Sequence, residues 1–253
     1  MKNKHIFFTI LFLFLTISCQ KNSETYFESM NTFMKVQCYG DNAAKANAEA
    51  QKLIGELNTL ISVTKPESEI YKLNHAESFP VEVSKLTADL LSTTLNMSKK
   101  TDGALNPCLY PVTSAWGFTT KKYRIPSEIE ISNLLKKCDY NNVKIKNNLV
   151  YAEPGMMFDL GAVGKGFAGD EAIKVLKKYG VKSAILDLGG NIQTIGSKPD
   201  GSKWTIGIKN PFSETPIGSL KISNKAVITS AGYERFFQTE DGQLHTAFYP
   251  LKI

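Results

Sequence analysis

The feature that most constrains this chain is a glycine-rich segment, residues 159–170, which reads DLGAVGKGFAGD. A short apolar run at 156–158 precedes it, and a run with helical spacing at 170–179 follows it. This order predicts a strand, a glycine-rich turn and the start of a helix. Such a turn can hold a phosphate, because glycine lets a ligand approach the backbone and N–H groups at a helix start point toward anions. Lys165 would add a cation there, and Asp159 a contact for a metal or a polar ring edge.

The glycine spacing does not match the two best-known phosphate loops. Gly161, Gly164 and Gly166 follow the order G-x-x-G-x-G, whereas dinucleotide-binding folds use G-x-G-x-x-G. A Walker A loop does not fit either, because Gly166 follows Lys165 where Ser or Thr is required. The spacing alone therefore leaves two interpretations open, a ligand-binding turn and an ordinary connection between a strand and a helix.

Charge and cysteine content narrow the class of protein. The 253-residue chain has a formal net charge of +6, and its lysines and arginines are dispersed, so the sequence does not support nucleic-acid binding. The four cysteines form no C-x-x-C pair and no cluster with histidine, which gives no support for a zinc site or a disulfide framework. A single disulfide stays open in an oxidising compartment. We expect Cys38, inside a strand-like run, to be a packing residue.

The N-terminus carries the pattern of a bacterial lipoprotein signal. Lys2 and Lys4 precede an apolar run at 6–17, and Cys19 follows it closely. A positive start with a short apolar run is typical of a secretory signal peptide, and this run is too short to span a membrane comfortably. We expect a signal peptide at 1–18, and a lipidated Cys19 that begins a polar tether at 19–26.

Lipidation would place the protein on the bacterial cell membrane, facing the periplasm. Plain secretion and an uncleaved anchor are the alternatives. Cleavage would lower the formal net charge to +4, because Lys2 and Lys4 are the only charged residues that the signal peptide removes.

Helix and strand patterns are mixed along the chain, with antiparallel hairpins in its second half, which predicts an α+β fold. The length suits one large domain or two small ones. Helical spacing predicts helices at 42–60, 88–100 and 127–138, with Asn42 and Ser127 as N-caps. A hairpin is predicted at 143–151 with an Asn-Asn turn. The other predicted strands lie at 34–39, 183–188, 204–208, 219–222, 226–230 and 234–238. Of these, 204–208 and 219–222 are expected to be antiparallel neighbours.

Six further blocks follow in order along the chain: MNTFM at 30–34, SVTKPESEI at 62–70, TDGALNP at 101–107, AWGF at 115–118, LDLGGNI at 186–192 and TSAGYERFF at 229–237. With the glycine-rich segment they resemble the motifs of the ApbE family, the FAD:protein FMN transferases. The resemblance covers roughly residues 27–245. It implies an ApbE-like flavin transferase domain at 27–253, incomplete at its C-terminus. The implied ApbE-type fold has a tunnelling-fold-like core, mixed and antiparallel sheets, and a cleft for the flavin.

The same resemblance implies a reaction and a set of site residues. A Thr or Ser hydroxyl of a target protein, a flavin-carrying subunit of a membrane redox complex, would displace AMP from FAD and keep the FMN. Asp159 and Lys165 would contact FAD, the backbone carbonyl of Ala162 would bind Mg²⁺, and His245 would take part in catalysis. The further flavin contacts implied by the resemblance are Met30, Thr64, Ala104, Leu105 and Asn106.

Each of these residues also has a plainer interpretation. Met30 and Leu105 could be ordinary core residues, Asp159 could cap the turn that follows it, and Lys165 could be a solvated surface lysine. Thr64 stands where relatives often carry tyrosine, so a stacking surface for a ring would be lost.

The resemblance ends after His245, where the chain reads TAFYPLKI. Relatives continue with an acidic residue and a threonine that complete the Mg²⁺ site, so we expect the C-terminal part and the metal site to be incomplete. Two alternative functions follow: an FAD pyrophosphatase, in which water replaces the protein hydroxyl, and a non-catalytic FAD-binding lipoprotein. A structural lipoprotein that binds no ligand is a third class.

Overall fold

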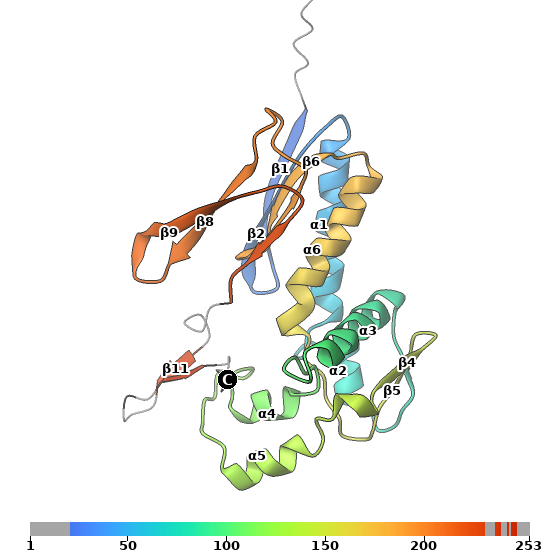
Figure 1. The fold of residues 1–253 in the computed structure, drawn as a ribbon. Coiled ribbons are helices and arrows are strands. Elements are labelled where there is room, and N and C mark those ends of the chain that lie inside the picture. The colour runs from blue at the N-terminus through green and yellow to red at the C-terminus, as the bar shows by residue number, and fades with distance from the viewer. Residues whose placement is uncertain (1–20, 231–235, 239–241, 243, 247–253) are drawn as a thin grey trace, which may run out of the picture.

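The computed structural model describes residues 21–230, 236–238, 242 and 244–246. Within these residues, the largest sheet is antiparallel throughout, and its strand order is β1-β2-β6-β7-β10 (Figure 1). Its strands, in chain order, are β1 (Asn22–Ser29), β2 (Thr32–Tyr39), β6 (Ser183–Asp187), β7 (Asn191–Ile195) and β10 (Ala226–Ile228). The predicted α+β class with antiparallel sheets is confirmed.

The β1–β2 hairpin places the first described residues at the edge of this sheet. Met30 and Asn31 form its two-residue turn with φ of 49° and 57°, the left-handed conformation that matches the twist of two paired strands. Along β2, alternate residues face the core, because successive side chains of a strand point to opposite faces. The strand β1 begins at Asn22, so residues 22–26 of the predicted tether are paired with β2.

Two long helices, α1 (Ala43–Leu60) and α6 (Gly161–Lys178), pack against each other and against one face of the sheet (Figure 1). Small residues at helical spacing let the two helices approach closely. On α1 these are Ala46 and Ala50, both fully buried. On α6, a Cβ at Gly164 would lie only 2.6 Å from Cδ1 of Ile61, at the end of α1.

The start of α6 corrects the predicted strand, turn and helix at 156–170. Residues 156–160 form no strand, and the helix begins at Gly161, so the glycines lie inside its first turns. A glycine inside a helix costs about 1 kcal/mol relative to alanine. Packing offsets this cost, because a Cβ at Gly169 would collide with the Gln193 side chain on β7, as one at Gly164 would with Ile61.

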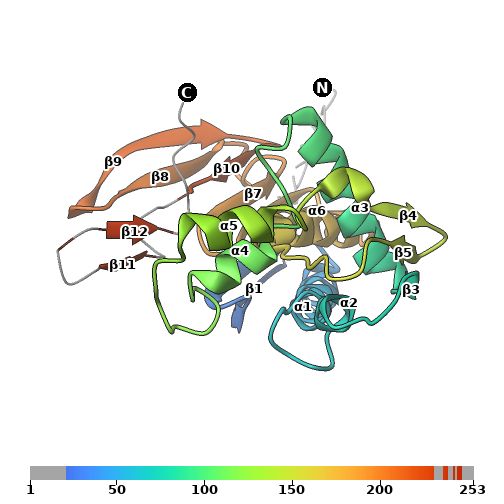
Figure 2. The ribbon, with the colours of Figure 1, turned by 90° about the horizontal axis from the view of Figure 1, so that it is seen from below.

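The shorter helices and a small sheet lie together at one end of the molecule (Figure 2). Two serines cap their helices as local chemistry predicts: Ser84 accepts from Thr87 N, and Ser127 from Glu130 N. Asn147 and Asn148 form the predicted hairpin turn with φ of 49° and 63°. The elements of this end are α2 (Glu69–Asn74), β3 (Val81–Glu82), α3 (Lys85–Lys100), α4 (Tyr110–Ala115), α5 (Glu128–Leu135), β4 (Lys144–Lys146) and β5 (Leu149–Tyr151).

The starts of two helices differ in detail from those expected. The helix α3 begins at Lys85 and not at 88, because Ser84 supplies the cap. Asn42 takes the N-cap position of α1, but its side chain makes no capping bond and donates instead to the carbonyl of Tyr179 at 3.2 Å. This bond ties the start of α1 to the end of α6.

The ribbon of β8 (Trp204–Asn210) and β9 (Ser213–Ile222) confirms the predicted antiparallel pair. Its buried residues Trp204, Ile206 and Ile222 pack against Tyr39 and Ile185 of the large sheet. A second, short hairpin of β11 (Phe236–Gln238) and β12 (Leu244–Thr246) follows. Residues 234 and 235 of the strand predicted at 234–238 lie outside the described residues.

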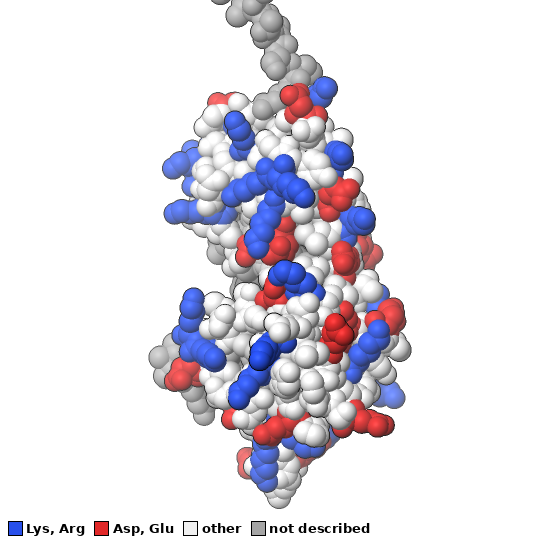
Figure 3. Space-filling view, turned by 90° about the vertical axis from the view of Figure 1, so that its right-hand side faces the viewer, with Lys and Arg blue, Asp and Glu red and all other residues white. Residues whose placement is uncertain are grey.

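The surface carries both signs of charge. On the face shown in Figure 3, basic side chains stand among acidic ones, with several basic side chains together in the upper part of the view. None of the helices in the described part of the chain is both long and apolar enough to cross a membrane. The predicted signal peptide and Cys19 lie outside the described residues, so the lipid anchor stays a prediction.

Candidate functional site

The start of α6 is the meeting point of two sequence blocks, those at 101–107 and 159–170. The backbone N–H of Asp159 donates to the carbonyl of Pro107 at 2.8 Å. Oδ1 of Asp159 accepts from the N–H of Gly161 at 2.7 Å, so this carboxylate satisfies one of the N–H groups at the helix start. The capping interpretation of Asp159 is therefore observed. Its second oxygen is left to accept from a ligand N–H or O–H.

Lys165 joins α6 to the loop between β6 and β7. Its half-buried side chain donates from Nζ to the carbonyl of Gly189 at 3.4 Å, a long hydrogen bond. Gly189 and Gly190 both have positive φ, 70° and 80°, and Oδ1 of Asp187 accepts from the N–H of Gly190 at 3.1 Å. The cation therefore stands beside a tight turn and is not an isolated surface lysine.

The β1–β2 turn reaches the same loop. A Cβ at Gly189 would collide with the Thr32 side chain, which follows the turn. The N–H of Met30 donates to Oδ1 of Asn58 on α1 at 3.0 Å. A positive φ is uncommon for a residue such as methionine, and backbone of this kind gathers at functional sites. Met30 thus belongs to the same neighbourhood as Lys165.

The loop that holds Ala104, Leu105 and Asn106 is tied down from within the protein. Nδ2 of Asn106 donates to the carbonyl of Cys138, and Oδ1 accepts from the N–H of Cys108, both at 2.8 Å. The N–H of Leu105 donates to Oγ1 of Thr101 at 3.1 Å. The Asn106 amide is thus used at both ends, whereas Ala104 is exposed. A flavin contact from these three residues stays a prediction.

Thr64 and Ala162 are both exposed, Thr64 after the end of α1 and Ala162 at the start of α6. Thr64 is exposed three residues after Ile61, and its hydroxyl is 3.3 Å from that of Ser62. Ala162 is exposed in the first turn of α6. The structure therefore leaves both residues accessible to a ligand.

His245 lies elsewhere, among aromatic rings. Its imidazole stacks on Phe237 with ring centroids 5.1 Å apart, and it lies 5.4 Å from the ring of Trp116. Nε2 is buried and has no hydrogen-bond partner within the described residues. No hydrogen bond or ring contact described for His245 joins it to Lys165. The first turns of α6, which carry Lys165, do lie at the end of that helix that faces α4 (Figure 1).

Three polar residues hold this site together without having been predicted. Asn74 makes two hydrogen bonds to the backbone of Phe158, Nδ2 to O at 2.9 Å and Oδ1 from N at 2.6 Å. Gln193 donates to the carbonyl of Gly166 at 3.1 Å, and Asn58 holds Met30. Their partners are far away in the sequence, so no local pattern points to them.

The described residues fit Mg²⁺ poorly. They contain no group of three His, Cys, Asp or Glu side chains that could hold a metal. Ala162 would offer a single carbonyl oxygen, whereas Mg²⁺ requires a near-octahedral set of oxygens. A metal site is not formed by this part of the chain alone.

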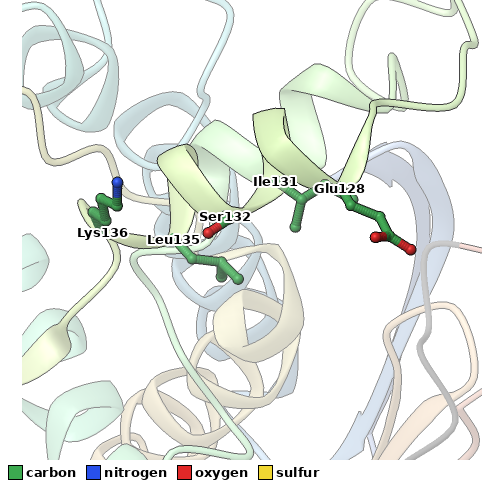
Figure 4. Close-up of a pocket in the computed structure, with 5 residues that line it drawn as sticks. All are labelled: Glu128, Ile131, Ser132, Leu135 and Lys136. Carbon is green, nitrogen blue, oxygen red and sulfur yellow. The ribbon is translucent and has the colours of Figure 1, made fainter.

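A shallow hollow along α5 is separate from these residues. It is lined by Glu128, Ile131, Ser132, Leu135 and Lys136, which all come from this helix or its C-terminal end (Figure 4). None of the predicted site residues lines it. We therefore assign no flavin contact to it.

The chain matches the model of a known protein family. The model of the ApbE family matches residues 30–250 of this chain. The chain belongs to the ApbE family. The match includes every site residue predicted above except Cys19.

Individual relatives agree with this assignment. The FAD:protein FMN transferase of Klebsiella pneumoniae is 30% identical over 227 residues, which cover 87% of this chain and 70% of the relative. The protein of the same name from Treponema pallidum is 28% identical over 245 residues, with 88% and 68% covered. The crystal structure of the ApbE protein of Thermotoga maritima superposes with a TM-score of 0.82 at 27% identity, covering 89% of this chain and 75% of that one. The predicted ApbE-type fold is confirmed.

Proposed function

We propose that this ApbE-family chain transfers FMN from FAD to a Thr or Ser hydroxyl of a target protein and releases AMP. Membership of a family whose relatives are named FAD:protein FMN transferase supports the reaction class. The observation that carries the proposal to this chain is the junction at α6. There the hydrogen bond from Asp159 to Pro107 joins the two blocks that hold predicted flavin contacts at 101–107 and 159–170, and the one from Lys165 to Gly189 adds the block at 186–192.

The charges at this junction suit a dinucleotide with a pyrophosphate. Lys165 and the first turn of α6 both attract negative charge, because N–H groups at a helix start carry partial positive charge. The Asp159 carboxylate neutralises part of that field and repels phosphate, so we assign it to the hydrogen-bonding edge of a ring or a ribose. Met30, held by Asn58, offers an apolar surface at the same junction.

The reaction needs a hydroxyl oxygen that attacks the phosphorus of the FMN half. The bond from this phosphorus to the oxygen bridging to AMP breaks, and AMP leaves with that oxygen. The hydroxyl proton goes to a base, and we assign this role to Nε2 of His245, an atom with no hydrogen-bond partner within the described residues. Mg²⁺ dependence stays a prediction, and no step is assigned to the metal.

The test combines FAD, with and without magnesium chloride, with a bacterial membrane fraction as the source of acceptor proteins. Covalent flavin is measured by fluorescence in a denaturing gel, and AMP and free FMN by chromatography. Transfer predicts covalent flavin with a matching amount of AMP. Free FMN and AMP without covalent flavin would show a pyrophosphatase, and quenching of flavin fluorescence without AMP would show binding alone.

Site variants connect this reaction to the junction. Lys165→Ala and Asp159→Ala should each weaken FAD binding about tenfold, the effect of losing one charge-assisted hydrogen bond. Lys177→Ala, in the last turn of the same helix, is the matched control. Unchanged affinity for FAD in both site variants would overturn the assignment of the junction.

The acceptor and the location form part of the same proposal. We assign the acceptor to a flavin-carrying subunit of a membrane redox complex. A lipid on Cys19 would hold the enzyme on the periplasmic face of the same membrane. Cys19→Ser should move the protein from the detergent-soluble membrane fraction to the soluble fraction. Membrane retention of this variant would contradict the anchor.

A further inference from the structure

His245 belongs to a cluster of five rings, which we call the ring cluster: Trp116, Phe118, Tyr123, Phe237 and His245. Phe237 is at its centre. It is stacked on Tyr123 with centroids 4.9 Å apart and planes 14° apart, and on His245 at 5.1 Å and 21°. Phe118 lies 5.7 Å from Phe237, and Trp116 lies 6.3 Å from it. Stacked and tilted rings at these separations attract each other beyond the burial of their area.

Within the described residues, the ring cluster joins the hairpin of His245 to the end of α4 and the loop after it. In the described part of the chain, β11 and β12 pair only with each other. Figure 1 shows β11 below the strands of the large sheet, and in Figure 2 β12 lies beside α4 and α5. Phe237 and His245 on the hairpin contact Trp116, Phe118 and Tyr123 at the end of α4 and in the loop after it. Position and orientation of the imidazole therefore depend on these rings.

The packing around His245 leaves its Nε2 without exposed surface, while the residue as a whole is half-buried. Nε2 of His245 is buried, although it can donate or accept a hydrogen bond. A hydroxyl reaches this atom only when the rings around it separate. A protein acceptor that binds the enzyme contributes binding energy to that separation, whereas water contributes none.

We propose that the ring cluster, through Phe237, sets the choice between transfer of FMN to a protein and hydrolysis of FAD. This inference rests on the proposed function and on the role of His245 in it. Phe237 is a positioning residue, which acts through the imidazole that it covers. In transfer, the oxygen of the acceptor hydroxyl bonds to the FMN phosphorus, its proton passes to Nε2 and AMP leaves. In hydrolysis, water supplies the oxygen and the proton, and free FMN and AMP are the products.

The test measures the ratio of free FMN to covalently bound FMN in one reaction with FAD, magnesium chloride and a bacterial membrane fraction. Phe237→Leu keeps an apolar side chain and removes the stacked ring. We expect this variant to raise the ratio about tenfold, since loss of a single apolar contact commonly changes discrimination by that order. Phe237→Tyr keeps the ring and should retain the wild-type ratio. The ratio does not depend on the folded fraction of a preparation, because both products come from the same active molecules.

Two controls fix the interpretation. Phe212→Leu makes the same change at a side chain that is 95% exposed between β8 and β9, and it should leave the ratio unchanged. His245→Ala gives the background of FMN released by the membrane fraction itself. An unchanged ratio in Phe237→Leu, or an equal rise in Phe212→Leu, would overturn the inference while the proposed function stands.

Failure of the proposed function gives a different result. If the wild-type chain forms no covalent flavin, that function is wrong. Release of free FMN from FAD in the absence of acceptor then tests the shielding alone. Faster release by Phe237→Leu than by the wild type would support shielding by the ring cluster, and equal or slower release would overturn it.

Discussion

Asp159 and Lys165 have opposite electrostatic effects at the start of α6, and the backbone explains both. Asp159 accepts from Gly161 N, which leaves the carboxylate facing the positive end of the helix, where a negative charge is stabilised. Lys165 lies one turn further along and reaches across to the Gly189 carbonyl. The start of α6 therefore presents a carboxylate that accepts hydrogen bonds and an ammonium group that donates them. This arrangement suits a ligand with both donor and acceptor groups.

Gly189 and its neighbour Gly190 allow two effects to be separated at the residue scale. Both have positive φ, but a Cβ would collide with Thr32 only at Gly189, whereas nothing lies within 4 Å of one at Gly190. Gly190→Ala should destabilise the protein by about 1–2 kcal/mol through backbone strain alone. Gly189→Ala should cost about 1–3 kcal/mol more, because the collision adds overpacking. Equal losses of unfolding free energy in urea would show that Thr32 moves aside freely.

At the scale of elements, the site depends on connections between helices and loops that are not neighbours in the chain. Asn74, at the end of α2, holds the backbone of Phe158 on the approach to α6. Asn58 on α1 holds the β1–β2 turn, and Asn106 joins the loop after α3 to the end of α5. Three asparagine side chains thus take the place of sheet or helix hydrogen bonds where irregular segments pass through the protein.

Asn74→Ala tests this role. The change leaves the N–H and the carbonyl of Phe158 buried without their partner, and each such group costs about 1–3 kcal/mol. We expect a loss of unfolding free energy of about 2–4 kcal/mol in chemical denaturation. Asn133→Ala is the matched control, because Asn133 is exposed on α5 and its side chain accepts only from Lys136; it should change stability by less than about 0.5 kcal/mol. Similar effects of the two variants would contradict the role given to Asn74.

At the scale of the whole molecule, the α1–α6 pair and the sheet bring the β1–β2 turn, the first turns of α6 and the β6–β7 loop to one place (Figure 1). The main core runs from this layer into the helical end of the molecule and includes the three described cysteines. None of these three thiols is in a disulfide. Cys38 is fully buried on β2, which confirms its predicted packing role.

Burial makes the stability of this core sensitive to alkaline pH. It raises the pKa of the Cys38 thiol to about 11 and that of Cys108 to about 12, from an ordinary value of 9.0. Between pH 9.0 and these raised pKa values, the thiols keep their protons in the folded state and lose them in the unfolded state. The unfolding free energy therefore falls as pH rises above 9.0. Urea titrations from pH 7 upward should show this decline. A Cys38→Ala, Cys108→Ala double variant should show less of it, and an identical decline would assign the effect to other groups.

Alkylation provides a second measurement on the same thiols. In the folded protein at neutral pH, Cys38, Cys108 and Cys138 should react with iodoacetamide only as fast as the core opens. In urea all three should react at once. Rapid labelling of Cys108 in the folded protein, located by mass spectrometry of its peptides, would contradict the burial described here.

The sequence by itself determined the family, through the order of its motifs. It also determined the α+β class, the helix cap at Ser127 and the Asn147–Asn148 turn, because these depend on local chemistry. It also pointed to the junction at 159–170, although it assigned the glycines to a turn. Only the tertiary structure decided that they lie inside α6, since the reason for Gly164 and Gly169 is a side chain from another part of the chain, Ile61 and Gln193. The same holds for Asn74 and Phe158, and for His245 and Trp116, which are distant in sequence and meet only when the chain has folded.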